Sequence, residues 1–341
     1  MNNPSISVIL SVYNGAPYLK EAIESILNQT FEDFEFIIVD DGSTDATSEI
    51  IDMFTDSRII RLYNKNNLGL VESLNKALAV SQGKFIARMD ADDISHPDRF
   101  QKQLFYLEHH SEVGILGTAM AQIDERGRPI SVLVPPSQHE LILWQTIFGC
   151  AVFHATVLMR RDDLIAVSGY DVDFLHSEDL DLWSRLFNKT KFANLPEVLY
   201  TRRLHRRSII STQFNSQHRN GIIIRRRLLK SILGCDVSPE SVTWFLNHDS
   251  LLNRQQKITA LNLLIDLYEK IIQTNSSSVS TVKSMRTYLI HRIILVNQSW
   301  PKLLLRRLTL YLGKLLPSPV RHKLKVITAK LIRGGYLKSN D

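Results

Sequence analysis

The sequence predicts an α/β protein with a mostly parallel sheet flanked by helices, followed by a C-terminal helical region. Over the first hundred residues, short buried strands alternate with amphipathic helices. Polar segments follow three of these strands directly, and beyond about residue 210 the sequence becomes helical, basic and poor in strand signals. Strands that alternate with helices in this way pair in parallel through right-handed crossovers.

The individual elements follow from the spacing of apolar residues, because short apolar runs predict strands and apolar residues three or four apart predict helices. In the first hundred residues the predicted strands are 6–10, 34–39, 59–62 and 85–89, and the predicted helices are 17–28, 44–54 and 70–80. The alternation then loosens. Further helices are predicted at 97–108, at 137–147 and after the acidic pair Glu178-Asp179, and further strands at 156–159 and 199–204.

Composition excludes several classes of protein. The chain has 341 residues, 44% hydrophobic and 22% charged, which is enough apolar material for a packed core. Its two cysteines cannot form a disulfide framework, and no Cys/His cluster has zinc spacing, so a reducing compartment fits best. The first residues lack the features of a signal peptide, and no apolar stretch approaches the roughly 20 residues that span a bilayer. We therefore expect a cytoplasmic protein.

Charge is distributed unevenly. Residues 1–100 carry 16 acidic and 8 basic residues, whereas the segment from Trp300 onward carries ten basic residues and one acidic residue. Basic and apolar residues are interleaved at Arg225-Arg226-Arg227, 303–316 and 324–332. This pattern is typical of helices on an anionic membrane surface, here the inner face of the plasma membrane, but also of helices that pack on the first domain and expose a basic face. No nucleic-acid-binding module is recognisable, so no nucleic-acid partner is expected.

Polar and acidic residues that could bind a ligand or take part in a reaction follow three of the predicted strands. Ser11–Gly15 follows the first strand, Asp40–Asp45 the second and Asp90–Asp93 the fourth. Because the carboxyl ends of parallel strands share one edge of a sheet, these segments should form one crevice. Clustered carboxylates repel one another unless a cation joins them, and the cations that prefer oxygen ligands shared with phosphates are Mn²⁺ and Mg²⁺. Helix capping is the alternative explanation, but a cap needs one aspartate at a time.

Five motifs in this order resemble the family 2 inverting glycosyltransferases of GT-A fold: Ser11–Gly15, Val39–Asp45, Asp90–Asp93, His96–Phe100 and Ser177–Trp183. The resemblance covers roughly residues 5–210. It implies the nucleotide-diphospho-sugar transferase fold, with a catalytic domain at 1–215 divided into a nucleotide-binding half (about 1–95) and an acceptor half (about 96–215). Residues 216–341 then form a separate basic helical region.

The resemblance also implies a reaction. Similar enzymes are metal-dependent, hexosyltransferase-type catalysts that use Mn²⁺ or Mg²⁺. They move a sugar with inversion from a nucleotide-diphosphate donor, most often a UDP-sugar, to a hydroxyl of a saccharide or lipid-linked acceptor. The products are cell-surface polysaccharides or glycolipids.

Roles for individual residues follow from the same resemblance. The expected general base is Asp179, and the expected metal ligands are Asp90, Asp92 and His205. Donor binding is assigned to Ser11, Val12, Tyr13, Asn14, Asp41, Arg88, Asp90 and Ala91. The diphosphate would contact Arg203 and His205, and the acceptor would contact Glu178, Trp183 and His154. Similar enzymes have a Tyr-Arg-x-x-His-x-x-Ser stretch here, which this chain resembles through Tyr200, Arg203 or Arg202, His205 and Ser208, with extra arginines.

Several of these residues have simpler explanations. The acidic pair Glu178-Asp179 could stabilise a helix N-terminus, and Trp183 has the helical spacing of a core aromatic. His154 fits a buried, hydrogen-bonded histidine at least as well as an acceptor contact. The stretch around Arg203 and His205 could be a solvated basic segment.

Two other functions remain open at the level of sequence. A nucleotidyltransferase has a related sheet, but its first loop is basic, and Ser11–Pro17 contains no Lys or Arg. A non-catalytic scaffold that binds a membrane or a partner is the second alternative, although the intact Asp92 and Asp179 argue against it. The absence of a G-x-x-x-x-G-K-[ST] loop and of a G-x-G-x-x-G motif after a strand excludes NTPases and dinucleotide oxidoreductases.

Overall fold

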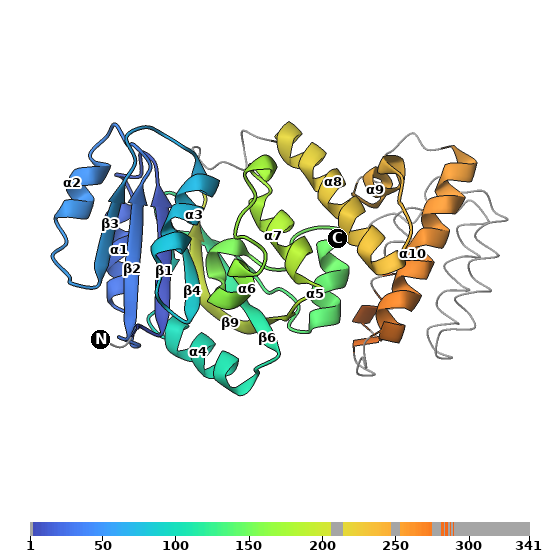
Figure 1. The fold of residues 1–341 in the computed structure, drawn as a ribbon, viewed down its shortest axis with the longest axis horizontal. Coiled ribbons are helices and arrows are strands. Elements are labelled where there is room, and N and C mark those ends of the chain that lie inside the picture. The colour runs from blue at the N-terminus through green and yellow to red at the C-terminus, as the bar shows by residue number, and fades with distance from the viewer. Residues whose placement is uncertain are drawn as a thin grey trace. The chain divides into compact units, whose positions relative to one another are not determined.

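The computed structural model describes residues 3–205, 214–246 and 253–274, together with residues 281, 282, 284, 285, 287 and 289. The chain divides into two compact units, Met1–Val282 and Lys283–Asp341, and the first carries the sheet and the helices labelled in Figure 1. None of the helices in the described ranges combines the length and the hydropathy that a membrane span requires. The basic segments 303–316 and 324–332 lie outside the described residues.

The first half of the sheet is parallel, as the sequence predicts. Its strands lie in the order β3-β2-β1-β4, and their bounds are β1 (Ile6–Val12), β2 (Phe34–Asp40), β3 (Ile59–Tyr63) and β4 (Phe85–Asp90). The crossovers run through α1 (Leu19–Leu27), α2 (Thr47–Asp52) and α3 (Leu70–Val80). Every residue of β2 is buried. Burial on both faces explains why these strands read as continuous apolar runs.

The second half of the sheet is mixed. Its strands are β5 (Ile94–Ser95), β6 (Val113–Ile123), β7 (Pro129–Leu133), β8 (Leu158–Arg160) and β9 (Lys191–Arg203). The short β8 joins the two halves, since it pairs antiparallel with both β4 and β6, and β9 runs parallel to β6. The apolar spacing does not predict β6 or β7. In β6, Gly117 leaves no room for a side chain, because a Cβ there would sit 2.2 Å from Asn194 Oδ1.

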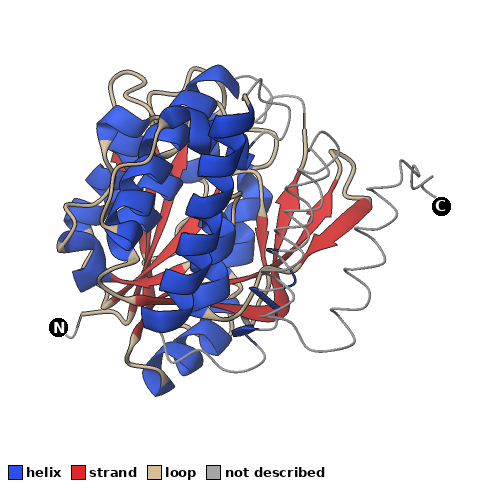
Figure 2. Ribbon diagram, turned by 90° about the vertical axis from the view of Figure 1, so that its right-hand side faces the viewer, coloured by secondary structure: helices blue, strands red, loops and turns tan. Residues whose placement is uncertain are grey.

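Helices account for most of the remaining described residues. They are α4 (Arg99–His109), α5 (His139–Thr146), α6 (Arg161–Ile165), α7 (Glu178–Leu186), α8 (Phe214–Leu233), α9 (Pro239–Leu246) and α10 (Arg254–Thr274), with short 3₁₀ turns η1 (His154–Thr156) and η2 (Val172–Phe174). Figure 2 looks onto the helices that follow the sheet, with the strands behind them. The helical character predicted beyond residue 210 is therefore present in α8, α9 and α10.

A buried arginine anchors the segment that follows the fourth strand. Arg99 is fully buried and donates from Nη2 to the carbonyl oxygens of Arg88 (2.9 Å) and Val157 (3.1 Å). Its guanidinium also lies 5.2 Å from the ring centroid of Tyr200, and burial lowers its pKa to about 10. The motif His96–Phe100 therefore ties β4, α4 and β9 together beneath the carboxylate segment.

Gly42 is a position where both the backbone conformation and the surrounding space disfavour a side chain. Its φ is +74°, and a Cβ there would lie 2.6 Å from the backbone carbonyl carbon of Asn66. Gly127 has nearly the same φ, +78°, but open space around it. Gly127→Ala should cost about 1–2 kcal/mol of stability for the left-handed backbone alone. Gly42→Ala should cost roughly 1–3 kcal/mol more, because backbone atoms must move apart.

Thermal unfolding of both variants beside the native chain measures the difference. The conformational strain is matched between the two positions, so the extra loss reports the clash with Asn66. Equal melting temperatures for the two variants would show that the segment after β3 moves aside freely.

Candidate active site

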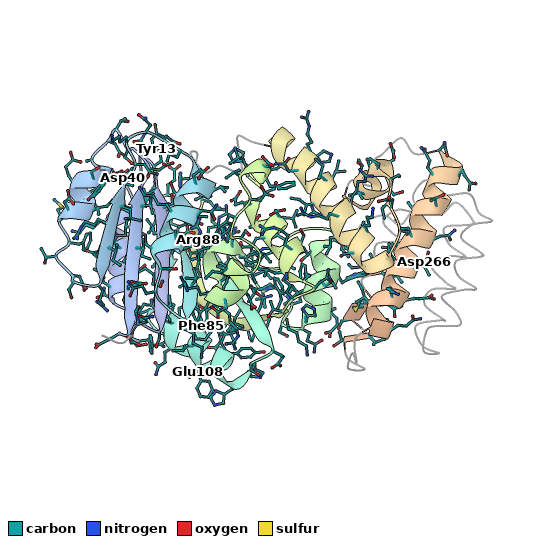
Figure 3. All side chains as sticks on the ribbon, in the orientation of Figure 1. Tyr13, Asp40, Phe85, Arg88, Glu108 and Asp266 are labelled. Atoms are coloured by element: carbon teal, nitrogen blue, oxygen red, sulfur yellow. The ribbon has the colours of Figure 1, made fainter. Side chains whose placement is uncertain are left out.

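The loops after β1 and β2 are joined side by side. The strand register places Val12 opposite Asp40 and Ser11 opposite Asp90, so the three polar segments leave the sheet at one edge. Figure 3 shows Tyr13 and Asp40 at this edge and Phe85 at the opposite one. This is the edge of the sheet at which the sequence predicts a crevice.

Asn14 makes the principal connection between these loops. It has a positive φ of 52°, a conformation that asparagine tolerates better than most residues. Its Oδ1 accepts from the Thr44 amide at 2.8 Å, and its own amide donates to Ser43 Oγ at 2.9 Å. The neighbouring Gly15 amide donates to Thr47 Oγ1 at 2.9 Å.

The residues expected to bind the donor divide into exposed and buried groups. Tyr13 is 49% exposed and offers a free aromatic ring at the edge, whereas Val12 is buried. Asp41 is also buried, and its carboxylate accepts from the Leu68 amide at 2.9 Å and the Gly69 amide at 2.8 Å. Asp41 therefore shapes the loop before α3. Ser11, Asn14 and Ala91 are partly buried around it.

The carboxylate cluster follows β4 directly. Oxygen atoms of Asp90, Asp92 and Asp93 all lie within 4.8 Å of one another. Burial, followed by the charge of Asp90, raises the pKa of Asp92 and raises that of Asp93 well above its usual range. Three acids this close are poorly stable as a charged group without a cation, and an all-oxygen donor set suits a hard divalent ion. The residues therefore fit the expected Mn²⁺ or Mg²⁺.

The members of this cluster have different partners. Asp93 accepts from the Arg203 amide at 2.8 Å and hydrogen-bonds the Tyr200 hydroxyl, so it is held by β9. Asp92 Oδ2 lies 2.8 Å from Nε2 of His205. Asp90 forms an ion pair with the guanidinium of Arg88. Asp92 and His205 are thus in direct hydrogen-bond contact, and Asp90 lies in the same carboxylate cluster.

Arg203 supports the carboxylate cluster through contacts of its side chain. Its side chain is 6% exposed and donates from Nη2 to Glu21 Oε2 at 2.5 Å and from Nε to the Asp92 carbonyl at 3.3 Å. The guanidinium also lies 4.8 Å from the ring centroid of Tyr18. These contacts take up the side chain that was expected to approach a diphosphate, so in this arrangement Arg203 orients the carboxylate segment.

The acidic pair lies at the N-terminus of α7. Glu178 is buried, and burial followed by the charge of Asp179 raises its pKa to about 7. Asp179 is half-buried and accepts from the Leu180 amide at 2.6 Å, and burial raises its pKa as well. Two adjacent carboxyl groups in such surroundings titrate as a unit. The pair can therefore hold or release a proton near neutral pH.

Arg88 links the acidic pair electrostatically to the cluster. It is 2% exposed, lies on β4 (Figure 3), and its pKa is raised by the neighbouring Asp90 against the effect of burial. Its positive charge lowers the pKa of both Glu178 and Asp179. One buried cation therefore acts on both groups of acids.

Trp183 and His154 lie in the interior beside the acidic pair. Trp183 is 2% exposed and makes edge contacts with Phe192 and with His154, at centroid distances of 5.8 and 5.9 Å. Nε2 of His154 lies 2.8 Å from the Tyr170 hydroxyl, and burial, with the charge of Arg88, keeps its pKa well below the usual range. This placement matches the packing explanation of both residues, since Trp183 presents no open ring face to an acceptor.

Sequence reasoning missed two residues that support the site. Tyr200 is buried, its hydroxyl accepts from the Asp90 amide at 3.2 Å, and it also bonds Asp93. Asp181 is fully buried two residues after Asp179. Tyr200 begins the segment that contains Arg203 and His205, so its place in that segment was the available signal.

The comparisons with known proteins agree with this geometry. The family model described as glycosyl transferase family 2 matches residues 7–166. An uncharacterized glycosyltransferase of Haemophilus influenzae is 32% identical over 260 residues, covering 72% of this chain and 76% of the relative. The putative glycosyltransferase EpsE of Bacillus subtilis is 37% identical, covering 58% and 73%. The O-antigen biosynthesis glycosyltransferase WbnJ of Escherichia coli is 34% identical, covering 60% and 81%.

Solved structures show the same fold at lower identity. S. aureus TarS 1–349 in complex with UDP-GlcNAc superposes with a TM-score of 0.58 and 19% identity, covering 86% of this chain and 91% of that one. A mannosyltransferase from Pyrobaculum calidifontis, solved with GDP-Man and Mn²⁺, gives 0.53 and 15%, covering 87% and 86%. The shared GT-A fold, the family match and the close relatives lead to one conclusion: this chain belongs to glycosyl transferase family 2.

Proposed function

We propose that this chain transfers a sugar, with inversion, from a nucleotide-diphosphate donor to a hydroxyl of a saccharide or lipid-linked acceptor, in the biosynthesis of a surface polysaccharide or glycolipid. The observation that carries the proposal is the pairing of a carboxylate cluster at the sheet edge with a separate acidic pair, with the buried Arg88 acting electrostatically on both. The E. coli relative named for O-antigen biosynthesis supports the product class. UDP is the nucleotide that we propose for the donor, since TarS was solved with UDP-GlcNAc.

We assign donor binding to the hydrogen-bonded loops after β1 and β2. The exposed ring of Tyr13 can stack on a nucleotide base, while the bonds from Asn14 to Thr44 keep the loop in place before the donor arrives. The acids Asp90 and Asp92, together with His205, would hold Mn²⁺ or Mg²⁺. When bound, that ion supplies Lewis-acid neutralisation of the diphosphate leaving group.

The acidic pair supplies the proton acceptor. In the proposed step an acceptor hydroxyl oxygen forms a bond to the anomeric carbon as the bond from that carbon to the diphosphate oxygen breaks, and the hydroxyl proton passes to the Asp179 carboxylate. Attack from the face opposite the leaving group inverts the configuration. Asp179 suits this role because it is only half-buried and can meet an acceptor, whereas Glu178 is enclosed.

A thermal-shift panel of UDP, GDP, CDP and dTDP, each with Mn²⁺ and with EDTA, tests the donor site. One nucleotide should stabilise the chain in a metal-dependent way, by about 2.7 kcal/mol at a concentration 100 times its Kd. Asp92→Ala should remove the shift. Asp236→Ala is the matched control, because it deletes a surface carboxylate whose partner is Lys230. A full shift in the Asp92 variant would show that the metal is held elsewhere.

Asp179→Asn should separate binding from turnover. The nucleotide shift should persist, while hydrolysis of the matching nucleotide sugar should fall about 10²–10⁴-fold, because the proton acceptor is lost. Asp173→Asn, an exposed carboxylate on the preceding turn, should leave the rate unchanged. Native turnover in the Asp179 variant would show that another group is the general base.

The raised pKa of Glu178 predicts a pH-dependent effect on stability. Between pH 4.5 and about 7 the folded chain binds a proton at Glu178 that the unfolded chain has released, so this group's contribution to stability declines as pH rises through that window. Glu178→Gln removes the titration. The variant should gain on the order of 2 kcal/mol relative to the native chain between pH 5 and pH 8. Melting curves at both pH values measure this change, and a constant difference would show that Glu178 titrates normally.

A further inference from the structure

The run Arg225-Arg226-Arg227 on α8 makes contacts within the fold, although Arg227 remains partly exposed. Arg225 donates to the carbonyl oxygens of Ile147 (3.0 Å) and Gly149 (3.1 Å), and Arg226 donates to that of Val237 (2.7 Å). Arg227 forms an ion pair with Asp181. The three side chains thus contact three different parts of the fold, which is the packing alternative that the sequence left open for this run. Their charges serve intramolecular contacts.

Arg227 holds the first turn of α7. Asp181 is fully buried and lies two residues beyond Asp179, and its two carboxylate oxygens accept from Arg227 and, at 2.8 Å, from Arg185. Nη2 of Arg227 also donates to Ser184 Oγ at 2.9 Å. A buried carboxylate with two guanidinium partners becomes costly when one partner is removed. The contact therefore fixes α7 against α8.

The loop that leads into the acidic pair is held by the same helix. The guanidinium of Arg227 lies 5.3 Å from the ring centroid of Phe174, and Asn220 Nδ2 donates to the Leu175 carbonyl at 3.1 Å. The next residue, His176, has a positive φ of 65°, a conformation that must be stabilised by its surroundings. Both sides of Glu178-Asp179 are therefore anchored to α8.

Arg225 places a second charge of α8 in the same region. It is 8% exposed and is held by the turn after α5. Its charge lowers the pKa of Asp179, which burial raises. The other titratable or charged groups that interact electrostatically with Asp179 are Arg88, Cys150, Tyr170 and Glu178.

We propose that α8 is a positioning element for the catalytic acidic pair, with Arg227 fixing the start of α7 and Arg225 supplying a positive charge beside it. The inference rests on the proposed function, because it concerns the geometry of the same proton acceptor. It extends the catalytic unit beyond the family match at residues 7–166 and beyond the boundary expected at 215, to include α8 through Leu233.

The three neighbouring arginines provide a matched test in the full-length chain. Arg227→Met should lower kcat for nucleotide-sugar hydrolysis at least 10-fold, with the donor KM within twofold of native and the metal-dependent nucleotide shift intact. Arg226→Met, which loses the hydrogen bond to Val237 and the charge near Glu240 but no contact to α7, should match the native chain. Hydrogen exchange of the amides of residues 175–182 should accelerate in the Arg227 variant and not in the Arg226 variant.

Arg225 has a separate readout. Arg225→Met should move the acidic limb of the kcat profile to higher pH, and Arg225→Lys, which restores a charge, should largely reverse the movement. If Arg227→Met fails to fold, Arg227→Lys serves instead, because it keeps a charge for Asp181 but loses the planar guanidinium that lies over the Phe174 ring.

The outcomes separate the two proposals. If the Arg227 and Arg226 variants agree in kcat and in hydrogen exchange, α8 does not position the acidic pair and the inference is wrong. If the native chain hydrolyses no nucleotide sugar but exchange accelerates only in the Arg227 variant, the positioning contact stands and the proposed function fails.

Discussion

Mutual repulsion among Asp90, Asp92 and Asp93 is the constraint on which the rest of the site depends. Three carboxyl groups within 4.8 Å would separate or take up protons if the fold did not restrain them. Arg88 on the same strand supplies one restraint. The others come from a distant part of the chain, Tyr200, Arg203 and His205 at and just after the end of β9. The order of strands in the sheet matters for function because it brings β9 back to the end of β4.

The same restraints divide the acids by role. Asp93 is occupied by β9 and keeps the segment in place, whereas Asp92 faces His205 and Asp90 faces Arg88. Glu178 and Asp179 stand apart on α7 and share the influence of Arg88. A catalyst of glycosyl transfer needs one set of acids that stays bound to a cation and another that changes its proton occupancy. In the proposed mechanism, burial and hydrogen-bond partners, rather than residue type, would create that difference.

Much of this arrangement is predictable from the sequence. The strands up to Asp90 are apolar runs because both faces of the sheet are covered, and parallel strands bring their polar ends together, so the cluster follows from pattern and topology alone. β6 is not predictable in this way, because glycines at 114 and 117 interrupt its apolar pattern to admit close neighbours. Nor are pairs such as Arg203 with Glu21 and Arg227 with Asp181, because a charged residue carries no sign of a distant partner.

The ion pair between Asp181 and Arg227 limits which segments can be exchanged between members of this family. A chimaera that joins the sheet-bearing segment of this chain to the helical region of another family member would bury Asp181 against a new helix. Unless that helix supplied a cation at the position of Arg227, the graft would leave a buried carboxylate with only Arg185 as partner. The two segments are therefore exchangeable only as a matched set, and the helix that follows the sheet is inherited together with α7.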